Sequence, residues 1–238
     1  MSSITDFVSM LESVHLQGVN EECVVTIADE QASVMAMDMT SSLYVQSSAA
    51  FDHEDDQFGV GDLALFIKYL KSYAGVEVEF TRSDNKLKIK PAGGSVTNYL
   101  LSEVDLIPTY DSEWEGEDKA TECIEEYSGK PTTLRVDRVD EFLKLMGLFS
   151  PNSINLTVNK KGAISVHGGN QTEHQFDIEL GKSKCGACDL KVYGPHFVAV
   201  LGSLDFEKKP VIYIQDEQPI TIVNGGDNWI LSPLDSEE

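Results

Sequence analysis

The chain has 238 residues and a formal net charge of -22, from 18 basic and 40 acidic side chains. The length suits one large domain or two smaller ones, and a hydrophobic fraction of 41% is typical of a folded protein and excludes a disordered one. As a total, this charge argues against a protein that attracts phosphates. The acids are unevenly spread, however, and gather in the segments 52–56, 103–126 and 235–238.

The sequence predicts a soluble intracellular protein that does not enter a membrane. Its first residues lack a basic region followed by an apolar run, so we expect no signal peptide. The longest apolar runs, such as 197–201, are too short to span a bilayer. Four cysteines without a secretion signal are most simply reduced thiols.

Four segments carry apolar residues at the spacing i, i+3, i+4, i+7, which predicts four amphipathic helices. The four patterns begin at Ile4, Leu63, Val139 and Phe197. Positions 4 and 63 are 59 residues apart, and positions 139 and 197 are 58 apart. The two halves are offset by 135 and 134 residues. Near-equal spacings at two levels indicate a unit that was duplicated and then duplicated again.

Each predicted helix is followed by two short apolar or alternating runs joined by turn residues, which predicts a β-hairpin. These pairs are 24–27 with 33–37, 76–80 with 87–89, 154–158 with 163–166, and 211–214 with 220–223. Further strands are predicted at 43–47, 95–101, 132–136, 175–180 and 189–193. The fold class is therefore α+β, with two similar domains that each carry an antiparallel sheet and two helices on one face.

The stretch 106–130 separates the two halves. It is acidic, contains Pro108, Gly116, Gly129 and Pro131 at or near its ends and middle, and shows no helical or strand period. We therefore expect a connector at 106–130 between a first domain at 1–105 and a second at 131–238.

The sequence contains no nucleotide-binding glycine loop, metalloprotease motif or nucleophile elbow, so we expect neither an enzyme nor a cofactor. The sharpest local motif is the C-x-x-C of Cys185 and Cys188. It is compatible with two incidental thiols in a turn, with half of a metal site and with a redox pair. The acidic run 52–56 lacks the spaced ligands of a calcium loop, so we expect a solvated loop there.

Several basic residues lie on or next to the predicted helices, away from the apolar stripes. Such residues are often solvated surface, but equivalent helices placed together would present them jointly to a phosphate backbone. The candidates for contact with a phosphate backbone are Lys68, Lys71, Arg138, Lys144, Lys208 and Lys209.

In the order of these elements the sequence resembles the two-domain sliding clamps of DNA replication, which include proliferating cell nuclear antigen (PCNA) and the T-even-type phage clamps. The resemblance is carried by the segments 34–45, 62–74, 98–106, 218–223 and 229–233. It implies a homotrimeric ring that encircles double-stranded DNA without reading its sequence. It also implies that an ATP-dependent clamp loader opens the ring and that the ring tethers a DNA polymerase. The first predicted helix departs from the family, because it has no Lys or Arg.

The resemblance implies two further surfaces. A groove for a short partner peptide would be lined by Met37, Tyr44, Ile107, Pro108, Pro219, Trp229, Ile230, Leu231 and Pro233. The ring interface would pair an edge of one domain with an edge of the other through Val96, Tyr99, Leu101, Phe176, Ile178 and Leu180. The protein is then expected in the cytoplasm, in the host cytoplasm if a phage encodes it, or in the nucleus of a eukaryote.

An alternative is an acidic protein-interaction module or DNA mimic that forms no ring and blocks a basic partner with its carboxylates. The position of the basic residues distinguishes a clamp from a DNA mimic, because a mimic gains nothing from basic residues gathered on one surface. An acidic rim around a more basic bore would leave the hole as the acceptable place for DNA.

Overall fold

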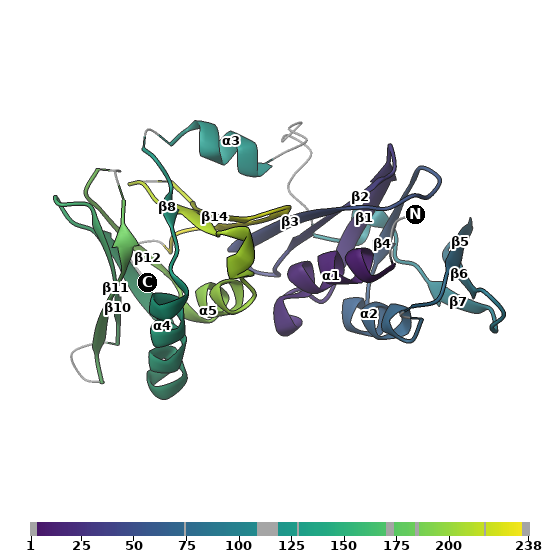
Figure 1. Ribbon diagram of the computed structural model, residues 1–238, viewed down its shortest axis with the longest axis horizontal. Coiled ribbons are helices and arrows are strands. Elements are labelled where there is room, and N and C mark those ends of the chain that lie inside the picture. The colour runs from purple at the N-terminus through teal and green to yellow at the C-terminus, as the bar shows by residue number, and fades with distance from the viewer. Residues whose placement is uncertain are drawn as a thin grey trace. The chain divides into compact units, whose positions relative to one another are not determined.

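The computed structural model describes residues 4–73, 75–108, 119–127, 129–169, 174–183, 186–216 and 218–234. The chain divides into two compact units (Figure 1). The first unit comprises Met1–Met39 and Val45–Ser112, and the second comprises Thr40–Tyr44 and Glu113–Glu238.

The first unit contains two α-helices and two antiparallel sheets. The helices are α1 (Ile4–His15) and α2 (Leu63–Lys71), and the short helices η1 (Leu16–Gly18) and η2 (Val104–Leu106) lie outside them. One sheet includes, in order, β4 (Asp56–Val60), β1 (Cys23–Ala28), β2 (Gln31–Met37) and β3 (Leu43–Ala50), of which β3 belongs to this unit from Val45 on. The other has the order β5-β6-β7, formed by β5 (Val78–Ser83), β6 (Lys86–Pro91) and β7 (Thr97–Leu100).

The second unit repeats this arrangement. Its helices are α3 (Lys119–Glu125), α4 (Val136–Phe149), α5 (Gly194–Gly202) and the short η3 (Phe206–Lys208). One sheet has the order β11-β10-β9-β12, formed by β9 (Ser153–Val158), β10 (Ala163–Gly168), β11 (Phe176–Lys182) and β12 (Cys188–Tyr193). The other includes, in order, β15 (Asp227–Leu231), β14 (Ile220–Asn224), β13 (Val211–Tyr213) and β8 (Thr132–Thr133).

The apolar stripes explain where the helices lie. In α2 the buried residues Phe66, Ile67 and Leu70 form one face, and the Asp62 carboxylate caps the helix by accepting a 2.8 Å hydrogen bond from the Leu65 N–H. α1 contacts α2 and α4 contacts α5, and each pair lies against a sheet (Figure 1). Each pair of stripes is thereby removed from water, and each pair of polar faces stays exposed.

Aromatic side chains fill the core of each unit. In the first unit the Phe7 ring stacks on Phe51 with centroids 4.4 Å apart, and Phe66 lies 4.8 Å from Tyr99. In the second unit Phe142 meets the edge of Phe197 at 5.5 Å. Burial of such rings is the largest contribution that a single side chain makes to a core.

The α+β fold class, the four amphipathic helices and the four hairpins are confirmed. One local prediction is wrong in its extent, and the structure adds detail to two others. The stretch 106–130, predicted as a connector, contains α3, in which Cys123 is buried; Tyr127, just after the helix, is buried too. The predicted strand at 132–136 ends at Thr133, since Val136 already begins α4. The acidic run 52–56 is a loop at 52–55, as predicted, with Asp52, Glu54 and Asp55 exposed, and only Asp56 belongs to β4.

Among the described helices the longest, α4, has 14 residues, and none has both the length and the hydropathy of a membrane span.

Candidate nucleic-acid interface

The exposed face formed by α1 and α2 carries the first two candidate DNA contacts. Lys68 is exposed and forms no ion pair with a residue that the structure describes. Lys71 donates to the Glu12 carboxylate of α1 in an ion pair across the two helices. Both lysines line an open hollow of about 440 Å³ together with Glu12 and His15. The face therefore presents one unpaired cation and one whose charge is compensated.

His15 adds little positive charge to this hollow. Partial burial lowers the pKa of its imidazole below 6.5, although the carboxylates of Glu12, Asp62 and Glu21 act in the opposite direction. Burial therefore favours the neutral imidazole over the charged one.

The exposed face of α4 mixes both signs of charge. The Arg138 guanidinium lies 2.9 Å from the Glu141 carboxylate one turn later. Arg135, just before the helix, donates twice to Asp137, and this hydrogen bonding lowers the pKa of that exposed carboxyl. Lys144 is exposed and has no ion pair within the described part of the chain. It is the unpaired cation of this helix.

Lys208 and Lys209 lie in and just after η3, beyond the end of α5 rather than on it. The Lys208 ammonium is 4.0 Å from the Asp227 carboxylate, and its side chain passes over Gly225, where an added Cβ would lie 2.8 Å from Cδ. Lys209 closes η3 in the left-handed conformation, with φ of 56°. α5 itself carries no Lys, Arg, Asp or Glu.

Taken together, the exposed helix faces carry nearly balanced charge. Such a surface attracts a phosphate backbone weakly, and because it neutralises few phosphates the salt dependence of binding should be shallow.

Most of the candidate groove residues are buried. Trp229, Ile230 and Leu231 of β15 are at most 1% exposed, so these side chains belong to the core of the second unit. Ile107 is buried on β4 of the first unit, where an added Cβ on Gly59 would lie 2.6 Å from its Cδ1. Tyr44 is buried as well. The half-buried candidates, which keep surface for a partner peptide, are Met37, Pro108, Pro219 and Pro233.

The segment around Pro233 is held in place on both sides. The Ser232 N–H donates to the Ser42 carbonyl at 2.9 Å, and the Leu234 N–H donates to the Lys191 carbonyl at 2.7 Å. His196 and Ser42 are hydrogen-bonded at 3.0 Å beneath it. This gives Pro233 a fixed position at the surface of the second unit.

The candidate interface strands are edge strands of their sheets. β7 ends the order β5-β6-β7, and β11 ends the order β11-β10-β9-β12. Most of the side chains chosen from the sequence point inward from these edges: Tyr99, Leu101, Phe176, Ile178 and Leu180 are buried, and Val96 is exposed. The outward positions on the same strands are Asn98, Leu100, Asp177 and Glu179. Strand alternation after the first inward residue is the signal that could have found them.

Tyr99 is anchored inside the first unit. Its hydroxyl donates to the Asp62 carbonyl at 2.8 Å, and burial raises the pKa of the phenol to about 12. The ring therefore supports β7 from beneath and does not reach across its edge.

Only one cysteine of the C-x-x-C motif lies within the described residues. Cys188 begins β12 and is buried, while Cys185 lies outside the described residues. Within the described ranges no group of three or more His, Cys, Asp and Glu side chains could hold a metal ion.

No protein-family model matches the sequence, and no curated protein does either. Solved structures match over nearly the whole chain. The PCNA2–PCNA3 complex from Sulfolobus tokodaii matches at 14% identity and a TM-score of 0.67, over 98% of this chain and 97% of that one. A. fulgidus PCNA, with the C-terminal region of FEN-1 bound, matches at 13% identity and a TM-score of 0.69, over 100% of this chain and 98% of that one. Helicobacter pylori beta clamp, bound to a DNA ligase peptide, matches at 12% identity and a TM-score of 0.72, over 100% of this chain and 66% of that one.

The chain has the fold of a DNA sliding clamp. The predicted two-domain clamp fold is therefore confirmed. The roles of the candidate residues in DNA contact, peptide binding and ring assembly, by contrast, remain predictions.

Proposed function

We propose that this protein is a processivity factor: a ring that encircles duplex DNA and tethers a DNA polymerase and other replication proteins. The observation that carries the proposal is a clamp fold over nearly the full length of both chains when compared with the Sulfolobus tokodaii protein. Three copies of two units form the ring, and the helix pairs of the units line its hole. An ATP-dependent loader opens it, and the chain itself performs no reaction.

The charge distribution supports this function. Lys68 and Lys144 are unpaired among the described residues, while Lys71 and Arg138 are compensated by Glu12 and Glu141. A clamp must slide, so its contacts with phosphates should be few, exchangeable and independent of sequence.

Partner binding is proposed from the neighbours. The A. fulgidus and Helicobacter pylori proteins hold peptides of FEN-1 and DNA ligase. Within the second unit, we place the equivalent contact at the half-buried positions Pro219 and Pro233. Met37 and Pro108 keep exposed surface in the first unit.

Light scattering combined with negative-stain imaging at 10 to 100 micromolar protein, an order of magnitude chosen to favour weak association, tests the assembly. The proposal requires a mass three times 26.2 kDa and closed rings with a central hole. A monomer throughout this range, with tight binding to basic DNA-binding proteins, would support the DNA mimic instead.

A further inference from the structure

Within the described residues of the first unit, the outer edge of β5 pairs with no other strand. β6 is the only strand that pairs with β5 in the described part of the chain. In a hairpin with a two-residue turn, the flanking pair Ser83 and Lys86 exchanges hydrogen bonds, and such pairs alternate along the ladder. Val78, Phe80 and Arg82 therefore direct their backbone N–H and C=O groups away from β6.

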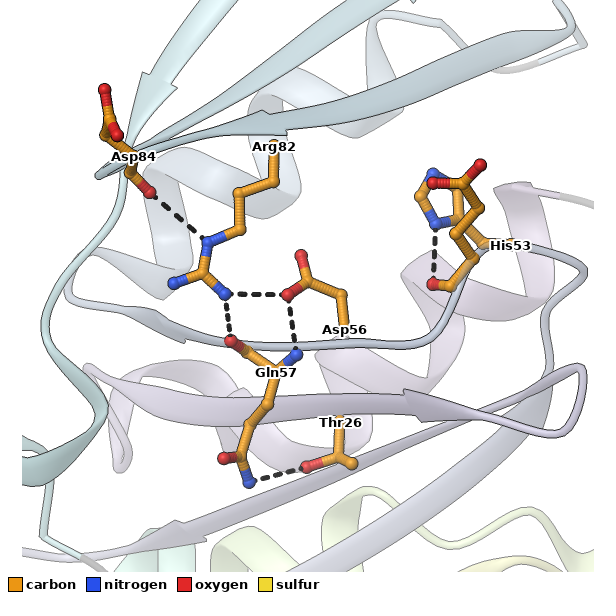
Figure 2. A network of polar contacts seen from close by, with 7 residues as sticks. Thr26, His53, Asp56, Gln57, Arg82 and Asp84 are labelled. Atoms are coloured by element: carbon orange, nitrogen blue, oxygen red, sulfur yellow. Dashed lines mark hydrogen bonds and ion pairs between the residues drawn. The ribbon is translucent and has the colours of Figure 1, made fainter.

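An open hollow of about 1200 Å³ runs along this edge. One wall is β5 with Glu77 before it, and the other is the segment Asp52–Asp56 that follows β3. Two side chains span it. His53 Nε2 donates to the Phe80 carbonyl at 2.9 Å. Arg82 donates to the Asp56 carboxylate at 2.7 Å and to the Gln57 carbonyl, as Figure 2 shows. Among the described residues this strand edge thus has no backbone partner, and its Phe80 carbonyl accepts only from the His53 side chain.

The second unit fills the equivalent place with a strand. β13 follows α5 as β5 follows α2, and β13 pairs with β14 on one side and with β8 on the other. The pairing continues beyond β8, where the Leu134 N–H donates to the Pro210 carbonyl at 2.9 Å. β8 also reaches the other sheet, because the Thr132 hydroxyl donates to the Lys182 carbonyl at 3.0 Å. The repeated architecture therefore accommodates an extended segment at this position.

The charge of the hollow indicates what kind of segment would fit. Its walls carry six carboxylates against Arg82 and Lys90, and both cations are paired, with Asp56 and with Glu79. Glu54, Asp55 and Glu77 are exposed and form no ion pair with any described residue. Extended peptides bind open sheet edges through main-chain hydrogen bonds, and flanking charges select the partner.

We propose that the outer edge of β5 is a docking site for an extended, lysine- or arginine-bearing segment of a partner protein, which adds to the sheet as a strand. The site lies within the first unit and is separate from the half-buried groove positions. It stands whether or not the chain forms a ring.

A capped, fluorescein-labelled peptide of six alternating Lys and Val residues is a suitable probe, read by fluorescence anisotropy. We expect Glu54→Lys combined with Glu77→Lys to weaken binding at least about tenfold, since two attractive contacts become repulsive. Glu125→Lys with Glu126→Lys on and after α3 makes the same change in net charge and should bind as the wild type does. Circular dichroism checks that both variants fold.

The same peptide with every backbone amide N-methylated keeps its charges but cannot donate to β5, and it should also bind at least about tenfold more weakly. Equal binding of the methylated peptide would reduce the site to general charge attraction and overturn the proposal. Equal binding by both charge variants, or no measurable binding by the wild type, would overturn it too. A change of oligomeric mass in the Glu54→Lys, Glu77→Lys variant without a change in peptide binding would assign the edge to a second copy of the chain.

Discussion

The two units share one arrangement of helices and strands but differ in how the outer edge of a sheet is covered. In the second unit β8 covers the outer edge of β13, whereas in the described part of the first unit β5 is paired on one side only. The helix pairs differ as well, because α2 carries two lysines and no acid, while α5 carries no charged residue. A duplicated fold thus preserves the buried pattern, while strand edges and exposed faces diverge to carry separate tasks.

Truncating a central aromatic residue in either unit should have the largest effect. Trp229 in the second unit and Phe66 in the first are both fully buried, so Trp229→Ala and Phe66→Ala should each lower the free energy of unfolding by about 3–5 kcal/mol. Hydrogen exchange should show the loss mainly in the unit that carries the change. If Trp229→Ala lowered the free energy of unfolding by less than about 1 kcal/mol, Trp229 would not be a core residue, and a position in a surface groove would be supported instead.

Alkaline pH should distinguish the first unit from the second through Tyr99. The pKa of this phenol is about 12 in the folded protein and near 10 in the unfolded chain. Above pH 10 the unfolded state therefore binds fewer protons, and stability falls as pH rises toward 12. Tyr99→Phe should flatten the difference in Tm between pH 9 and pH 11 for the first unit. Identical pH profiles for the two proteins would contradict the buried phenol.

The helix caps provide a smaller contrast. α2 is capped by the Asp62 carboxylate, whereas no side chain caps the N-termini of α4 and α5. Asp62→Ala should lower the stability of the first unit by about 1 kcal/mol, measured by urea denaturation. Asp62→Asn, which retains the acceptor, should recover most of it. A neutral Asp62→Ala would mean that the cap contributes nothing.

The smallest effect is expected on DNA. Lys68→Ala with Lys71→Ala should reduce the salt slope of binding to a short duplex by about 1 rather than 2, because Glu12 already compensates Lys71. Lys160→Ala with Lys161→Ala, in the exposed turn between β9 and β10, is the matched control. If the control pair lowers affinity as much, the α1–α2 face is not the DNA contact.

Much of this fold could be predicted because its helices and hairpins repeat local patterns. The stripes around Phe66 and Phe142 give the helices directly. β4 was missed, since Gln57 and Gly59 break the alternation, and Gly59 is required there by the close approach of Ile107. Local spacing cannot show that Lys71 meets Glu12, because the two are 59 positions apart.

The candidate groove also shows that the sequence does not reveal which side chains tertiary packing buries. Family resemblance selected Trp229 and Ile230 by residue type, but burial depends on the strands that pack around them. An aromatic residue near a flexible segment has the same sequence signature in a core as in a binding pocket.

The central claim, that this protein is a ring linked topologically to DNA, is tested most directly by retention on circular and linear DNA. The protein is placed on a nicked plasmid with its ATP-dependent loader and ATP, washed in high salt, and half of the sample is then linearised. A sliding clamp stays on the circle and is lost from the linear molecule, because its ends let the ring slide off. Equal retention on both forms, or equal loss from both, would contradict the account.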